Sequence, residues 1–246
     1  MTIGVFDILP GVFTIGNLFC GFLAIRYSLL GEPVYAAWLI ILATFFDALD
    51  GKLAKFAKSL TKFGMEFDSL ADVVSFGLAP AILVIPFLKA VAGRWTLVLG
   101  FLFLLSGTIR LARFNGYFQG GEKTGYRGLP ITMAGGTLAA YVIFSVELWG
   151  RVRSPEFLLL LIVVMSAVMI STFPYETYPE LAWKGRRNRL KIVLFGLCAI
   201  AIAVDPPLAF FPLALLYLLT GVGIGLYRFG RSVILNQLST KNQGDR

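Results

Sequence analysis

Residues 47–72 read DALDGKLAKFAKSLTKFGMEFDSLAD, and this stretch is the most informative part of the chain for its fold and function. Four aspartates, Asp47, Asp50, Asp68 and Asp72, lie here in otherwise strongly apolar surroundings. An ionised carboxylate in or near lipid is costly unless a partner neutralises it. The lysines between the aspartates are too mobile and too near water to neutralise all four, so we predict bound Mg²⁺ or Mn²⁺, which prefer hard oxygen ligands. These lysines are Lys52, Lys55, Lys58 and Lys62.

The spacing of the aspartates predicts that they converge. The first two are three residues apart and the last two are four apart, so on a helix each pair projects from one face. The short connection between the pairs lets the two helices lie antiparallel, and the four carboxylates can then meet at the cytoplasmic end of the helix pair. Gly51 and Gly64 lack a Cβ and would let a ligand or a neighbouring backbone approach closely.

The composition indicates a membrane protein. Hydrophobic residues make up 57% of the 246 residues and charged residues only 15%, against about 25% charged in a soluble domain. The apolar runs are near the roughly 20 residues that a membrane-spanning helix needs. We predict an all-α polytopic helix bundle with about eight transmembrane helices, one membrane domain over residues 1–234 and a polar, disordered tail over 235–246. The eight runs lie near 10–31, 33–50, 65–88, 94–115, 128–148, 154–173, 190–204 and 207–228.

The basic residues predict the orientation. The net charge is +8, and the 22 lysines and arginines are unevenly distributed. When the eight predicted spans are placed across a membrane, 17 of these residues lie on one side and five on the other. By the positive-inside rule both termini are cytoplasmic in a multi-pass protein of the cell membrane. We therefore expect a membrane-lipid environment and no nucleic-acid partner. The five are Arg26, Lys89, Arg94, Arg151 and Arg153.

Two absences narrow the chemistry. The chain has no histidine, so a histidine base, a Ser-His-Asp triad and a histidine-ligated metal are excluded. Cys20 and Cys198 fall inside predicted spans, where a structural disulfide is not expected.

A cation transporter whose aspartates form an ion path stays as an alternative, although we find no inverted repeat of the kind common in secondary transporters.

The acidic stretch resembles the signature of the CDP-alcohol phosphotransferase family of membrane enzymes, D-x2-D-G-x2-A-R-x8-9-G-x3-D-x3-D. Every fixed position is filled except the arginine, which is Lys55 here. The resemblance implies transfer of a phosphatidyl-type group from a CDP-linked lipid to an alcohol, with release of CMP. It also implies a six-helix core with two further helices, and a homodimer.

Carried over to this chain, the resemblance assigns roles to the aspartates. Asp47, Asp50 and Asp68 would be ligands of two divalent ions, and Asp72 would be both a ligand and the catalytic base. Residues on the nucleotide and diphosphate side would be Asn17, Gly51, Ala54, Lys55 and Gly64. A lysine at position 55 keeps the positive charge but lacks the planar two-point donor of arginine.

Further stretches are similar to the members of that family that use serine as the acceptor. They are NLFCGF at 17–22, FDSLADVVSFGLAP at 67–80, RLARFN at 110–115 and GLP at 128–130. The implied reaction joins CDP-diacylglycerol and L-serine to give phosphatidylserine and CMP. Glycerol 3-phosphate or an inositol phosphate stays as an alternative acceptor.

Basic side chains at the end of the fourth predicted span are candidates for binding the acceptor. Arg110 and Arg113 are three residues apart and could bind the serine carboxylate on a shared face. The alternative is that both only anchor the span at the membrane interface. Asn115, Lys123 and Arg127 are weaker candidates.

Overall fold

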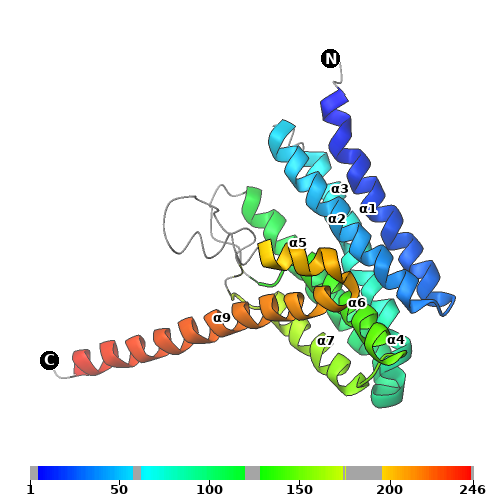
Figure 1. Cartoon of the computed structure of the whole chain (residues 1–246). Helices are drawn as coiled ribbons and strands as arrows, with labels where there is room; N and C mark the ends of the chain where they lie inside the picture. Colours follow the sequence, from blue (N-terminus) through cyan, green and yellow to red (C-terminus); the bar gives the residue numbers. More distant parts are fainter. Residues whose placement is uncertain (1–4, 58–61, 120–127, 174, 176–195, 245–246) are drawn as a thin grey trace.

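The computed structural model describes residues 5–57, 62–119, 128–173, 175 and 196–244. For residues 5–10, 54–57, 62, 117–119, 226 and 228–244 it describes the backbone only. Every regular element in these ranges is helical, as the sequence predicts. The helices form a bundle in which segments far apart in sequence lie side by side (Figure 1).

The helical elements follow one another with few interruptions. Residues 196–204 are also helical. The labelled elements are α1 (Val5–Leu29), α2 (Pro33–Ala57), α3 (Lys62–Asp72), the π-helix η1 (Val73–Leu78), α4 (Ala79–Ala92), the 3₁₀ turn η2 (Gly93–Trp95), α5 (Thr96–Gln119), α6 (Ile131–Trp149), α7 (Pro155–Ile170) and α9 (Pro206–Gly244).

Five helical stretches in the described part of the chain are long and apolar enough to cross a membrane. The longest, Phe63–Gly116, is not one straight helix: α3, η1 and α4 run continuously, the chain turns at Gly93, and α5 packs back against α4. Gly93 has a φ of +51°, which favours glycine. α7 is a shorter apolar helix. The prediction of an all-α membrane bundle is thus confirmed. The five stretches are Gly11–Leu29, Pro33–Leu53, Phe63–Gly116, Ile131–Trp149 and Pro206–Gly225.

Small residues let the N-terminal hairpin close tightly. α1 and α2 pack against each other along their length, and Ala24, Ala36, Ala37 and Ala43 are fully buried. Small side chains at helix contacts are how membrane helices approach closely, because lipid supplies no hydrophobic drive between them. Cys20 is buried in the same core, and both cysteines are free, as expected from the sequence.

The π-helix η1 lies at the centre of the bundle, directly after Asp72. Its residues Ser75, Phe76 and Gly77 are buried, and α1, α5 and α6 all pack against it. A π-helical turn inside an α-helix is rare and is often found at a functional site. It joins α3 and α4 into one continuous helical path, so the position of Asp72 is tied to the core.

The last helix, α9, packs on the bundle through its first turns and then projects from it (Figure 1). Asp205 caps it by accepting a hydrogen bond from the backbone of Leu208, at 3.2 Å. Phe211 contacts the rings of Tyr141, Phe144 and Phe157.

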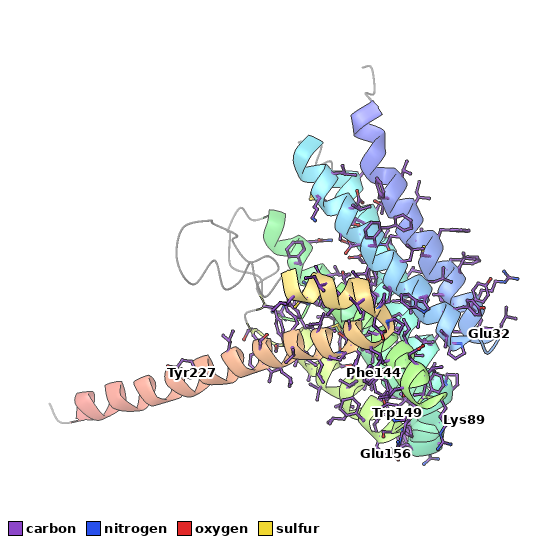
Figure 2. The ribbon with its side chains drawn as sticks, in the orientation of Figure 1. Glu32, Lys89, Phe144, Trp149, Glu156 and Tyr227 are labelled. Carbon is purple, nitrogen blue, oxygen red and sulfur yellow. The ribbon has the colours of Figure 1, made fainter. Side chains whose placement is uncertain are left out.

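The projecting part of α9 includes residues from the predicted tail. α9 continues to Gly244, so the described backbone of residues 235–244 is helical. Tyr227 lies on the projecting part and is exposed (Figure 2).

At the end of the bundle away from the projecting part of α9, α4 and α6 end and α7 begins. Lys89, Trp149 and Glu156 are labelled at this end in Figure 2. Lys89 is one of the five basic residues that the sequence places on the side away from the cytoplasm.

Candidate active site

Three of the four aspartates meet at one point between α2 and α3. Asp47 projects from α2, and Asp68 and Asp72 from the last turn and a half of α3. One oxygen of each carboxylate lies within 4.8 Å of one oxygen of both others. Asp72 is the most enclosed of the three, with 7% of its surface exposed. The convergence that the i, i+4 spacing predicts therefore holds for these three carboxylates.

Asp50 lies one turn further along α2 and makes a different contact. Its Oδ2 accepts a hydrogen bond from the hydroxyl of Thr14 on α1. Its Oδ1 is buried and has no hydrogen-bond partner in the described part of the chain. Asp50 is thus buried beside the group of three and carries one unused acceptor.

Two further polar side chains donate to the group of three. Asn17 on α1 donates from Nδ2 to Oδ1 of Asp72 at 3.1 Å. Thr132 on α6 donates from Oγ1 to Oδ2 of Asp47 at 3.2 Å. Thr132 was not predicted from the sequence: it is far from the acidic motif, although it lies two residues after the GLP stretch at 128–130.

The donor set suits a hard divalent cation. All the candidate ligand atoms are carboxylate oxygens, the type that Mg²⁺ and Mn²⁺ prefer. Among the described residues Oδ1 of Asp68, like Oδ1 of Asp50, is buried without a hydrogen-bond partner. Buried acceptors without partners are rare in native proteins and call for an explanation such as a bound ion. The residues present therefore fit the metal that the sequence implies.

The two arginines predicted to act as a pair have different surroundings. Arg110 is 5% exposed, and its charge interacts with Asp72. Arg113 donates from Nη1 to the backbone oxygen of Ile170 at 2.7 Å, at the C-terminal end of α7. Arginine is favourable there because the last carbonyls of a helix lack intrahelical donors. Arg110 therefore lies at the acidic group, whereas Arg113 holds α5 to α7.

Asn115 also joins two helices close to the site. It donates from Nδ2 to the hydroxyl of Ser69 at 3.0 Å, and Ser69 lies on α3 between Asp68 and Asp72. The contact ties the end of α5 to the helix that carries two of the acids.

The remaining predicted site residues are only partly described. At Gly51 no atom of the described residues, apart from its chain neighbours and the backbone of its own helix, lies within 4 Å of the position that a Cβ would take, so there is open space beside it for a ligand. Gly64 is exposed. The side chains of Ala54 and Lys55 lie outside the described residues, as do Lys123 and Arg127.

A membrane helix bundle in which carboxylates from two helices converge fits a metal-dependent membrane enzyme. Residues 7–173 match the CDP-alcohol phosphatidyltransferase family, and the chain belongs to that family. The match includes all four aspartates and the residues that donate to them, Thr14, Asn17 and Thr132.

Curated relatives resemble the chain over most of its length. It is 30% identical over 228 residues to the CDP-diacylglycerol-serine O-phosphatidyltransferase of Helicobacter pylori, covering 90% of this chain and 92% of the relative. It is 37% identical over 175 residues to the archaetidylserine synthase of Methanothermobacter thermautotrophicus, covering 69% and 70%. It is 30% identical over 222 residues to the CDP-diacylglycerol-serine O-phosphatidyltransferase of Mycobacterium leprae, covering 86% and 72%.

Proposed function

We propose that this chain transfers the phosphatidyl group of CDP-diacylglycerol to the hydroxyl of L-serine, giving phosphatidylserine and CMP. The names of its relatives support serine as the acceptor. The observation that carries the proposal is the convergence of Asp47, Asp68 and Asp72 within 4.8 Å in a chain of this family.

The reaction exchanges one bond to phosphorus for another. The serine oxygen forms a bond to the phosphorus of the lipid phosphate, and the bond from that phosphorus to the oxygen of CMP breaks. The electron pair leaves with CMP, and the proton of the serine hydroxyl passes to a carboxylate, which we assign to Asp72.

The other aspartates would hold the metal. Asp47, Asp50 and Asp68, together with Asp72, would bind two Mg²⁺ or Mn²⁺ ions. When bound, such ions neutralise the diphosphate oxygens and stabilise the leaving CMP. The chain's own contribution is a fixed group of oxygens, because Thr14 and Thr132 already restrain Asp50 and Asp47.

The substrates would occupy opposite sides of this group. Nucleotide and diphosphate contacts are assigned to Asn17, Gly51, Ala54, Lys55 and Gly64, of which Gly51 has open space beside it. The serine carboxylate is assigned to the α5 end, with Arg110, Arg113 and Asn115 as candidates. Arg110 is favoured for direct contact, because it is buried and its charge interacts with Asp72.

The membrane topology is part of the proposal. We infer about eight spans, both termini in the cytoplasm, and an active site at the cytoplasmic face of the cell membrane. The acyl chains of the donor would stay in the bilayer and enter laterally between helices. The functional unit would be a homodimer of the 1–234 domain.

An acceptor assay tests the proposal. Purified protein receives CDP-diacylglycerol, Mn²⁺ or Mg²⁺ and one acceptor at a time: L-serine, glycerol 3-phosphate or an inositol phosphate. We expect CMP release with serine only. Release with glycerol 3-phosphate but not with serine would reject the serine assignment while keeping the family chemistry. A CDP-linked ether lipid run in parallel decides which donor is preferred.

Two matched substitutions separate the enzyme from a transporter. Asp72→Asn should abolish CMP release and leave donor binding, measured at saturating Mn²⁺, largely intact. Asp205→Asn is the control, because asparagine caps a helix about as well as aspartate and position 205 is the cap of α9. If instead Asp72→Asn impairs cation flux in liposomes and the wild type releases no CMP, the aspartates form an ion path.

A further inference from the structure

The helix α1 lies against two of the four acids through side chains on one face. Thr14 donates to Asp50, and Asn17, three residues later, donates to Asp72. Residues three apart on a helix share a face, so one side of α1 supplies donors to acids from both α2 and α3.

Asn17 is fixed more firmly than an ordinary helix residue. It is 0% exposed, and its backbone oxygen accepts a hydrogen bond from the hydroxyl of Ser75 at 2.9 Å. One turn further on, a Cβ at Gly21 would lie 2.7 Å from the Cα of Ser75, so α1 touches the backbone of η1 there. These two contacts set the register of α1 against the π-helix that follows Asp72.

Repulsion between neighbouring carboxylates makes a restraint on Asp72 necessary. Its carboxylate lies within 4.8 Å of those of Asp47 and Asp68, and like charges this close favour rotation away from one another. A hydrogen bond to Oδ1 from a buried amide opposes that rotation. The amide carries no charge, so it orients the carboxylate without neutralising it. A lysine or an arginine in its place would also neutralise the carboxylate.

We propose that Asn17 is a positioning residue: its amide nitrogen holds the carboxylate of Asp72 in the orientation that faces Asp47 and Asp68. The proposal rests on the function proposed above for its consequence in catalysis, but the geometry it describes exists without substrate. Asn17 would therefore affect metal binding through Asp72 before any nucleotide is present.

Metal binding without substrates provides the first test. Mn²⁺ binding to purified protein is measured by calorimetry and by electron paramagnetic resonance for Asn17→Ala and for Asn17→Leu. Leucine has the same branching and the same number of side-chain heavy atoms without the hydrogen-bonding groups, so it covers the case in which the alanine variant does not fold. Loss of a side chain that orients a metal ligand typically weakens metal binding about 10–100-fold, and we expect a loss in this range.

A control on the same helix separates positioning from general packing. Ser28 is buried on α1 and donates only to the backbone oxygen of Ala24 on its own helix. Ser28→Ala should leave Mn²⁺ affinity within about twofold of the wild type, because this hydroxyl donates within its own helix and not to an acid of the site.

A double-mutant cycle shows whether Asn17 acts through Asp72. In an Asp72→Asn background, Asn17→Ala should weaken Mn²⁺ binding no further. If the two losses multiply, Asn17 acts independently and the proposal is wrong. It is also wrong if Mn²⁺ affinity is unchanged and only the KM for the CDP-linked donor rises, which would make Asn17 a nucleotide contact alone. Absence of serine-dependent CMP release in the wild type would reject the proposed function, whereas the metal-binding cycle would still decide the role of Asn17.

Discussion

Two neighbouring glycines on α6 should respond in opposite ways to the same substitution. A Cβ at Gly135 would lie 2.5 Å from the backbone oxygen of Phe76 and 2.8 Å from its Cα. A Cβ at Gly136 would meet only the hydroxyl of Thr44, at an ordinary contact distance of 3.6 Å. Alanine is therefore tolerated at position 136 and overpacked at position 135.

The size of the difference follows from these distances. The contact at Gly135 falls about 0.9 Å short of the 3.4 Å at which ordinary contact begins, and a backbone carbonyl has no rotamer with which to move aside. Overpacking of this kind costs about 1–3 kcal/mol. Replacing glycine by alanine inside a helix gains about 1 kcal/mol at both sites, so this gain cancels in the comparison. We expect Gly136→Ala to raise the free energy of unfolding. The Gly135→Ala variant should have a free energy of unfolding about 1–3 kcal/mol lower than that of the Gly136→Ala variant.

The displacement should also reach the acidic group. Thr132 lies three residues before Gly135 on the same helix, and its hydroxyl is 3.2 Å from Oδ2 of Asp47. If α6 moves outward by about 0.9 Å to relieve the overlap, this hydrogen bond exceeds the usual length limit. Gly135→Ala should then lose CMP-releasing activity in addition to stability, whereas Gly136→Ala should keep it.

The assay uses thermal unfolding in detergent, followed by the fluorescence of the four tryptophans, together with CMP release at a temperature where both variants are folded. A shift of 1 kcal/mol corresponds to about 2–4 °C in a domain of this size. Equal unfolding temperatures for the two variants would refute the close approach of α6 to η1. Equal activity at unequal stability would refute the link to Asp47.

Three further outcomes are expected. Thr132→Val removes the donor to Asp47 and should lower Mn²⁺ affinity and CMP release about tenfold or more. Thr137→Val is the control and should leave both unchanged, because the hydroxyl of Thr137 donates to the backbone of its own helix. Equal losses in the two variants would contradict the role of Thr132. Arg113→Ala removes the bond to Ile170 and should lower the free energy of unfolding by about 1–2 kcal/mol, measured by denaturant titration, with an unchanged unfolding curve arguing against it. EDTA should abolish CMP release and added Mn²⁺ or Mg²⁺ restore it; activity that persists in EDTA would argue against a metal requirement.

Local spacing in the sequence predicts much of the acidic site. The three- and four-residue intervals within the motif predict shared helix faces, and Asp68 and Asp72 do face Asp47 across α2 and α3. The long apolar runs likewise predict the all-helical membrane class. These features depend on helix periodicity and hydrophobicity, which act over a few residues.

Contacts between distant helices are what the sequence does not predict. The donation from Thr132 to Asp47 joins residues 85 positions apart, and threonine in an apolar helix is more often bonded to its own backbone. Arg113 has the same spacing from Arg110 as two residues sharing a face, yet it bonds to the end of α7. Only the packing of α5 against α7 decides which of the two arginines reaches the acids.

The packing of η1 connects these observations. Each helix that donates to an acid of the group of three also carries a glycine one turn further on that touches the backbone of η1: Gly21 follows Asn17 on α1, and Gly135 follows Thr132 on α6. Because η1 begins directly after Asp72, it positions one acid and provides the surface against which both donor helices are placed. A shift of η1 would therefore move Asp72 and both donors together, so close packing at this segment, which carries no charge itself, sets the geometry of the carboxylates.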